Sequence, residues 1–86
     1  MNTTDFSSLK RSTHPVPDFV ERALLERNLM EAYKNRPPYQ QNDYIGWITR
    51  AKREATVKKR LKQMLAELAQ GDVYMKMAWK SGRHRL

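Results

Sequence analysis

Residues 43–68 read DYIGWITRAKREATVKKRLKQMLAEL, and this stretch decides the fold because it carries the clearest helical periodicity of the chain. In its first half, the apolar residues at helical spacing are Tyr44, Ile45, Ile48 and Ala51. In its second half, apolar residues recur at i, i+4, i+7, i+8 and i+11, namely at Val57, Leu61, Met64, Leu65 and Leu68. Such spacing is typical of amphipathic helices, so we predict helices over residues 44–51 and 55–68.

The apolar faces of these two helices do not line up. At ~100° per residue, one straight helix would place the second face roughly 150° around from the first. Two such faces cannot pack into one core, so we expect a break between Lys52 and Ala55, although no proline or glycine marks it. The alternative is an unbroken helix covered on both sides, for which so short a chain hardly has the residues.

Two shorter helices are expected upstream. Pro17 suits the first position of a helix, because its missing N–H would be unpaired there. This helix should end near Arg27, and its apolar face consists of Phe19, Val20, Ala23 and Leu24. Asn28, with Glu31 three residues on, fits a capping box at the start of the next helix. Pro38 can open the helix that follows, with the polar residues 40–43 as its exposed first turn.

The C-terminal part is expected to be extended. Gly71 suits the position after the last helix, and apolar and polar residues alternate beyond it as in a strand. Because no partner strand is evident, we expect Val73, Tyr74 or Trp79 to pack this segment onto the helices. The predicted fold is therefore all-α, a small bundle of about four short helices with an extended C-terminal segment packed on it.

The length of 86 residues allows one domain. We predict a flexible N-terminal arm over residues 1–16, a single helical domain over residues 17–80, and a basic flexible tail over residues 81–86. The absence of cysteine excludes disulfides, thiolate metal sites and a cysteine nucleophile. We expect no signal peptide and no membrane span, because the first residues and the longest apolar runs fit neither. We expect a cytoplasmic monomer.

No group of residues in the sequence fits catalysis, a metal or a cofactor. The two histidines, His14 and His84, fall in the segments expected to be flexible, whereas catalysis needs fixed geometry. The three glycines are isolated, so they form no phosphate-binding loop. We therefore expect a protein that is not an enzyme, with no catalytic residue, no bound metal and no cofactor.

The net charge of +8 is concentrated in one stretch. Residues 1–49 are neutral overall, whereas residues 50–62 carry seven basic residues against Glu54 alone. A local basic field suggests an anionic partner, although a solvated helix face that keeps the protein soluble would look the same. The candidate partner-binding residues are Trp47, Arg50, Lys52, Arg53, Lys58, Lys59, Arg60 and Lys62.

The same stretch resembles a known protein family. The order of Tyr44, Trp47-Ile48, Ala51-Lys52, Thr56 and Arg60-Leu61 is similar to the signature of the YdeI/OmpD-associated (OmdA-like) bacteriocin-protection family. The resemblance covers about two thirds of the chain. It implies an all-helical bacterial domain, linked by name to bacteriocin protection, to resistance against antimicrobial peptides and to outer-membrane proteins, and it implies no catalytic residue. Three positions depart from the family pattern, which often has Pro, Glu and Arg at Glu54, Ala55 and Val57.

Three hypotheses follow. In the first, a non-enzymatic helical interaction domain presents a basic face to an acidic protein or another anionic partner. In the second, two helices joined by a short turn bind nucleic acid nonspecifically through the same face, since Ala55, Thr56 and Val57 offer no base-reading side chain. In the third, the chain is an accessory to an active site on another chain.

Overall fold

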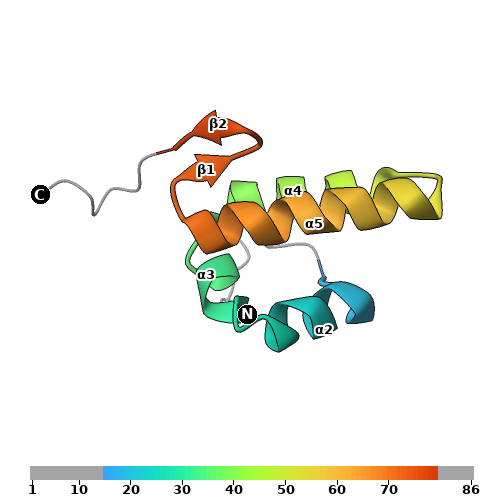
Figure 1. Cartoon of the computed structure of the whole chain (residues 1–86), viewed down its shortest axis with the longest axis horizontal. Helices are drawn as coiled ribbons and strands as arrows, with labels where there is room; N and C mark the ends of the chain where they lie inside the picture. The colour runs from blue at the N-terminus through green and yellow to red at the C-terminus, as the bar shows by residue number, and fades with distance from the viewer. Residues whose placement is uncertain (1–14, 80–86) are drawn as a thin grey trace, which may run out of the picture.

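Four helices and a short β-hairpin build the part of the chain that this computed structural model describes, residues 15–79 (Figure 1). The elements in order are α2 Asp18–Glu26, α3 Met30–Lys34, α4 Pro38–Arg50, α5 Glu54–Gln70, β1 Val73–Tyr74 and β2 Met77–Ala78. The predicted small helical bundle is therefore confirmed. Of the predicted N-terminal arm, only residues 15 and 16 are described, and the predicted C-terminal tail lies entirely outside the described residues. The domain limits therefore stay predictions.

The predicted break in the central stretch is confirmed. The backbone leaves the helical conformation at Ala51, with ψ of 137°, and is still extended at Arg53, with ψ of 141°. Helices α4 and α5 therefore fold back on each other and lie side by side in opposite directions (Figure 1). This reversal turns both apolar stripes toward one core, with Tyr44, Ile45 and Ile48 buried from α4, and Met64, Leu65 and Leu68 from α5.

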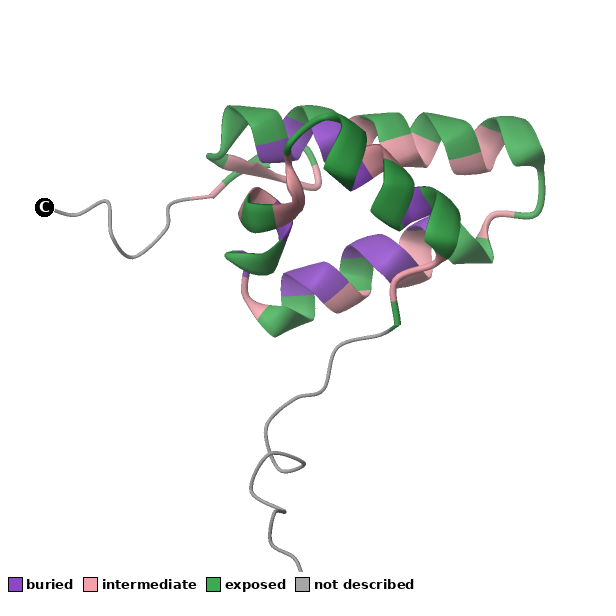
Figure 2. Cartoon of the chain, turned by 90° about the horizontal axis from the view of Figure 1, so that it is seen from below, coloured by how far each residue is buried: buried purple, intermediate pink, exposed green. Residues whose placement is uncertain are grey.

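Helices α2 and α3 cover the other side of this core. Val20 and Leu24 of α2 and Tyr33 of α3 are buried, and Figure 2 shows buried stretches on α2 as well as on the two long helices. Phe19, which was assigned to the apolar face, is instead 41% exposed. Leu61 and Val57 of α5 are half-buried, because they lie toward the end of the core near the turn.

The capping box predicted at Asn28 is wrong. Asn28 has φ of 61°, in the left-handed region, and it ends α2 instead of beginning α3. Its N–H donates to the Leu25 carbonyl at 3.1 Å, and the Leu29 N–H donates to the Leu24 carbonyl at 2.8 Å. This pair of bonds is the Schellman arrangement, in which asparagine is one of the few non-glycine residues that adopt the required conformation.

The prediction of an exposed first turn in α4 is also wrong at two residues. Gln40 is fully buried and Gln41 is 8% exposed. The Gln41 Nε2 donates to the Arg36 carbonyl at 2.8 Å, and the Gln40 Oε1 accepts from the Arg36 Nη1 at 3.0 Å. These amides are buried because they satisfy polar groups at the junction of α3 and α4, which a sequence pattern of polar residues does not reveal.

The C-terminal segment does have a partner strand, which corrects the sequence-based expectation. Strand β1 pairs antiparallel with β2, so that Val73 faces Ala78 and Tyr74 faces Met77. Met75 and Lys76 make the turn with φ of 50° and 66°. Two successive positive φ values are typical of a type I′ hairpin turn, which usually contains asparagine and glycine.

Glu67 of α5 holds this unusual turn in place. Its carboxylate accepts hydrogen bonds from the backbone N–H groups of Met75 and Lys76, both at 2.8 Å. It also accepts bonds from the Tyr44 hydroxyl and from the Gln63 Nε2, the latter at 3.0 Å. The side chain is only 4% exposed, and these four donors satisfy a charge that burial would otherwise make very costly.

Arg36 holds the hairpin to the helices through contacts with Val73 and Trp79. Its Nη2 donates to the carbonyls of Glu67 at 3.1 Å and Val73 at 2.9 Å. Its guanidinium lies 4.6 Å from the centre of the Trp79 ring, a cation–π contact. Tyr74 completes the attachment, because its ring packs edge-on against Tyr44 with the centroids 5.6 Å apart.

Glu67→Gln should destabilise the protein by about 1–3 kcal/mol, because the two turn N–H groups bond different carboxylate oxygens and glutamine replaces one of these oxygens with an NH2 group that cannot accept. Urea unfolding measures this loss as a lower midpoint at an unchanged slope. The control is Glu21→Gln on the exposed side of α2, where a change within about 0.5 kcal/mol is expected. Equal effects of the two substitutions would contradict the role of Glu67.

Stability should fall at alkaline pH because three tyrosines resist ionisation in the folded state. Burial raises the pKa of Tyr33 to about 12, and burial with a carboxylate partner raises the pKa of Tyr44 and Tyr74. Each tyrosine therefore favours folding fully below about pH 10, its unfolded value, and loses this contribution as the pH rises toward its folded pKa. Urea unfolding from about pH 8 to about pH 11 should show this decline.

Tyr33→Phe provides the control, because the Tyr33 hydroxyl has no hydrogen-bond partner within residues 15–79. This variant should be at least as stable as the natural chain at neutral pH and should lose less stability at high pH. An identical decline in both proteins would contradict the contribution of Tyr33.

Candidate functional site

The exposed cations of the central stretch form what we call the basic surface. Arg50 ends α4, Lys52 and Arg53 lie in the turn that follows, and the remaining members are the α5 residues Lys58, Lys59 and Lys62. All six side chains are exposed. Their position follows from the fold, because the turn between α4 and α5 points away from the core and the apolar stripe of α5 occupies the inner face.

Few of the positive charges of the basic surface are neutralised by nearby carboxylates. Lys58 lies 3.9 Å from the Glu54 carboxylate one helical turn earlier, but both side chains are more than 70% exposed. Such a pair contributes well under 1 kcal/mol in most proteins. Within residues 15–79, no other member of the basic surface makes an ion pair, so most of its charge faces solvent.

Trp47 and Arg60 behave differently from the other candidate residues. The Arg60 Nη1 donates to the Trp47 carbonyl at 2.6 Å, and the guanidinium lies 5.1 Å from the centre of the Trp47 ring. Both residues are half-buried. They connect α4 to α5 close to the turn, so the structure places them in a brace between the helices.

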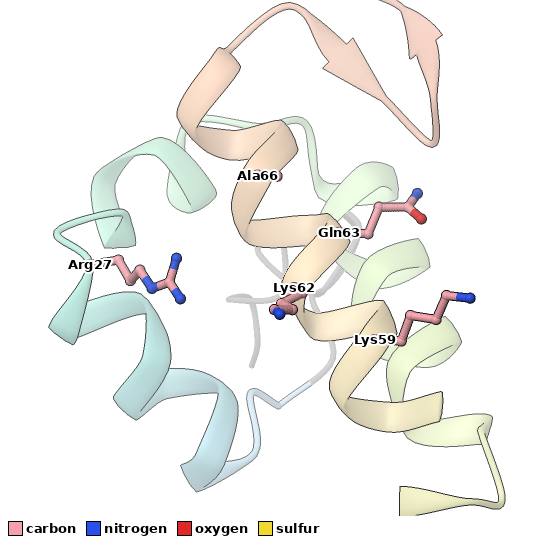
Figure 3. A pocket seen from close by; sticks show the side chains of 5 residues that line it. All are labelled: Arg27, Lys59, Lys62, Gln63 and Ala66. Carbon is pink, nitrogen blue, oxygen red and sulfur yellow. The ribbon is translucent and has the colours of Figure 1, made fainter. Parts of the chain in front are cut away.

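A shallow groove adjoins the basic surface. It has a volume of about 460 Å³ and is lined by Arg27, Lys59, Lys62, Gln63 and Ala66. Figure 3 shows Arg27 reaching from α2 toward α5, with Lys62 on the facing part of α5. Sequence reasoning missed Arg27, which lies far from the basic stretch, and Gln63 and Ala66, which are uncharged. The feature of the sequence that could have indicated the groove is the helical spacing of Lys59, Lys62, Gln63 and Ala66, which places them on one outward face of α5.

The described part of the chain contains neither a metal-ligand cluster nor a membrane-spanning helix. Between residues 15 and 79, no three histidine, aspartate or glutamate side chains lie close enough to hold a metal ion. None of the helices there is both long and apolar enough to span a membrane. His14 and His84 lie outside the described residues.

Comparison with known proteins identifies the family. The model of the family described as "Bacteriocin-protection, YdeI or OmpD-Associated" matches residues 13–71. The chain belongs to this family. Searches of curated proteins and of solved structures gave no match.

The family signature mostly describes the structure of the YdeI/OmpD-associated domain. Tyr44 and Ile48 lie in the core, and Trp47 and Arg60 form the brace. Glu54, where members often have proline, is the first residue of α5. Proline is favoured at that position, and an acidic residue there is favoured by the helix dipole, so either residue is compatible with the break.

Arg60→Ala should destabilise the domain by about 1–2 kcal/mol, because the variant loses both the hydrogen bond and the cation–π contact. Arg60→Lys should recover only part of this loss, since lysine lacks the planar guanidinium. The matched control is Lys59→Ala on the exposed face of the same helix, with an expected change within about 0.5 kcal/mol. Thermal and urea unfolding test the series, and equal effects at residues 59 and 60 would refute the brace.

Proposed function

We propose that the chain is a non-enzymatic interaction domain that presents its basic surface to an acidic protein or another anionic partner. The observation that carries this proposal is the exposure of six cations, of which only Lys58 faces a described carboxylate. Clustered like charges repel one another and do not stabilise the fold. Binding of a partner of opposite charge would relieve this repulsion. A surface that serves solubility alone commonly mixes both signs.

The name of the family supports a role in bacteriocin protection, which we extend to this chain as part of the proposal. Many antimicrobial peptides are cationic, and like charges across an interface oppose association. Direct capture of such a peptide by the basic surface is therefore disfavoured. An anionic protein of the same cell, in the cytoplasm, is the better match in charge.

The non-enzymatic part of the proposal rests on residue types. Lysine and arginine on exposed, flexible side chains supply charge but no oriented base or nucleophile. Catalysis would need side chains held in one geometry. The residues that are held firmly, such as Glu67 and Arg36, are committed to the hairpin.

Nucleic acid is the less favoured anion. The start of α5 carries Ala55, Thr56 and Val57, and the last two are half-buried, so no side chain there can read base edges. Helix α5 also packs alongside α4 instead of standing out as a recognition helix (Figure 1). Nucleic-acid binding by this surface would be nonspecific and steeply salt-dependent.

The test is a titration with polyglutamate, duplex DNA and single-stranded DNA at two salt concentrations. Polyglutamate should bind at low salt, and the triple variant Arg50→Gln, Lys52→Gln, Arg53→Gln should weaken this binding by about tenfold. The control removes the same charge at exposed positions elsewhere, with Arg22→Gln, Lys34→Gln and Lys76→Gln, and should weaken binding by less than about threefold.

Two outcomes would contradict the proposal. Equal losses in the two triple variants would mean that net charge alone matters and that the basic surface is not a site. Tighter binding of either DNA than of polyglutamate, with a steep salt dependence, would favour a nucleic-acid-binding protein instead.

A further inference from the structure

The outer face of α5 is exposed at Lys59, Lys62 and Ala66, and Gln63 beside them is half-buried. Lys59, Lys62, Gln63 and Ala66 follow one another at i, i+3, i+4 and i+7, which is the spacing of one helix face. The core residues Met64, Leu65 and Leu68 occupy the inner side of the same helix. Arg27, which directly follows α2, completes the lining of the groove. Figure 3 shows Lys62 on the side of α5 toward Arg27, and Lys59 and Gln63 pointing to the other side.

The groove combines an apolar floor with a cationic rim. Its lining surface is mostly carbon, contributed by Ala66 and by the side-chain stems around it. Lysine and arginine keep their charged ends in water while their stems cover apolar surface. The lining contains three cations and no acidic residue. A complementary occupant therefore carries both apolar groups and carboxylates.

Its shape narrows the choice of occupant. The groove is shallow and open, so it cannot enclose most of the surface of a small molecule, as ligand pockets do. No aromatic side chain lines it, so it offers no platform on which the bases of a single strand could stack. Ala66 presents a small side chain on an exposed helix face, which lets a second helix approach closely.

We propose that this groove is the docking site for an acidic amphipathic helix of the partner protein. The apolar side chains of that helix, at i, i+3, i+4 and i+7, contact Ala66 and the neighbouring stems. Its flanking carboxylates pair with Arg27 on one side and with Lys62 on the other. This inference rests on the proposed function, because it specifies the partner of the basic surface, and it adds Arg27 of α2 to that surface.

The experiment compares two synthetic peptides of identical leucine and glutamate content. In the amphipathic peptide, the leucines follow helical spacing on one face and the glutamates flank them. The control peptide has the same residues in scrambled order. We expect the amphipathic peptide to bind about tenfold more tightly and to gain helix by circular dichroism when it binds. Equal affinities, or binding without helix formation, would overturn the inference.

The variants locate the site. Arg27→Gln with Lys62→Gln should weaken binding of the amphipathic peptide by about tenfold, whereas the matched pair Arg22→Gln with Lys34→Gln should change it by less than about twofold. Thermal unfolding should show that both pairs remain folded, as expected for exposed side chains. An unchanged affinity in the first pair would overturn the groove as the docking site.

Failure of the groove is distinguishable from failure of the proposed function. If polyglutamate binds through Arg50, Lys52 and Arg53 but the amphipathic peptide shows no preference, the basic surface stands and the groove does not. If neither polyglutamate nor the peptide binds at low salt, both proposals fail. If duplex DNA displaces the amphipathic peptide from the groove at equal charge concentration, the occupant is nucleic acid and the inference is overturned.

Discussion

The attachment of the hairpin to the helices depends on the buried carboxylate of Glu67. It lies where α4, α5 and the hairpin meet, and it accepts hydrogen bonds from the Tyr44 hydroxyl and from two backbone N–H groups of the turn. The turn residues Met75 and Lys76 have positive φ, which costs free energy in residues other than glycine. The carboxylate offsets this cost, since it bonds both N–H groups only when the turn has this shape. The hairpin then covers its end of the bundle, while the outer face of α5 stays exposed.

The structure divides structural residues from candidate functional ones within a single stretch. Of the residues shared with the family signature, Tyr44 and Ile48 fill the core, and Trp47 and Arg60 brace α4 against α5. The exposed cations lie between and beyond these positions. Because they contribute little to packing, they can change with little effect on stability, whereas changes to the bracing residues should destabilise the domain. Family membership therefore reports mainly on the architecture, and the proposed activity rests on charge and shape.

Periodicity in the sequence was sufficient to predict the long helices and the break at residues 51–53, because the direction of a helix face depends only on residue spacing along the chain. It failed for Gln40 and Gln41, because they are buried against the guanidinium and the carbonyl of Arg36 at the junction of α3 and α4. It also gave no sign of the bonds that Glu67 accepts from the hairpin turn. The hairpin escaped prediction because its turn lacks the usual asparagine and glycine and is held by a distant carboxylate. The basic surface was predictable as a local run of charge. The groove was not, since Arg27 joins α5 only through tertiary packing.

The proposed anionic partner would bind this protein on α5 and on the turn before it. Chemical-shift mapping of the backbone amides during titration with polyglutamate tests this most directly. We expect shifts to concentrate at residues 50–53 and 59–66 and to return to their starting values when salt is added. Shifts concentrated on the hairpin, or spread evenly over the cations of the whole chain, would contradict it.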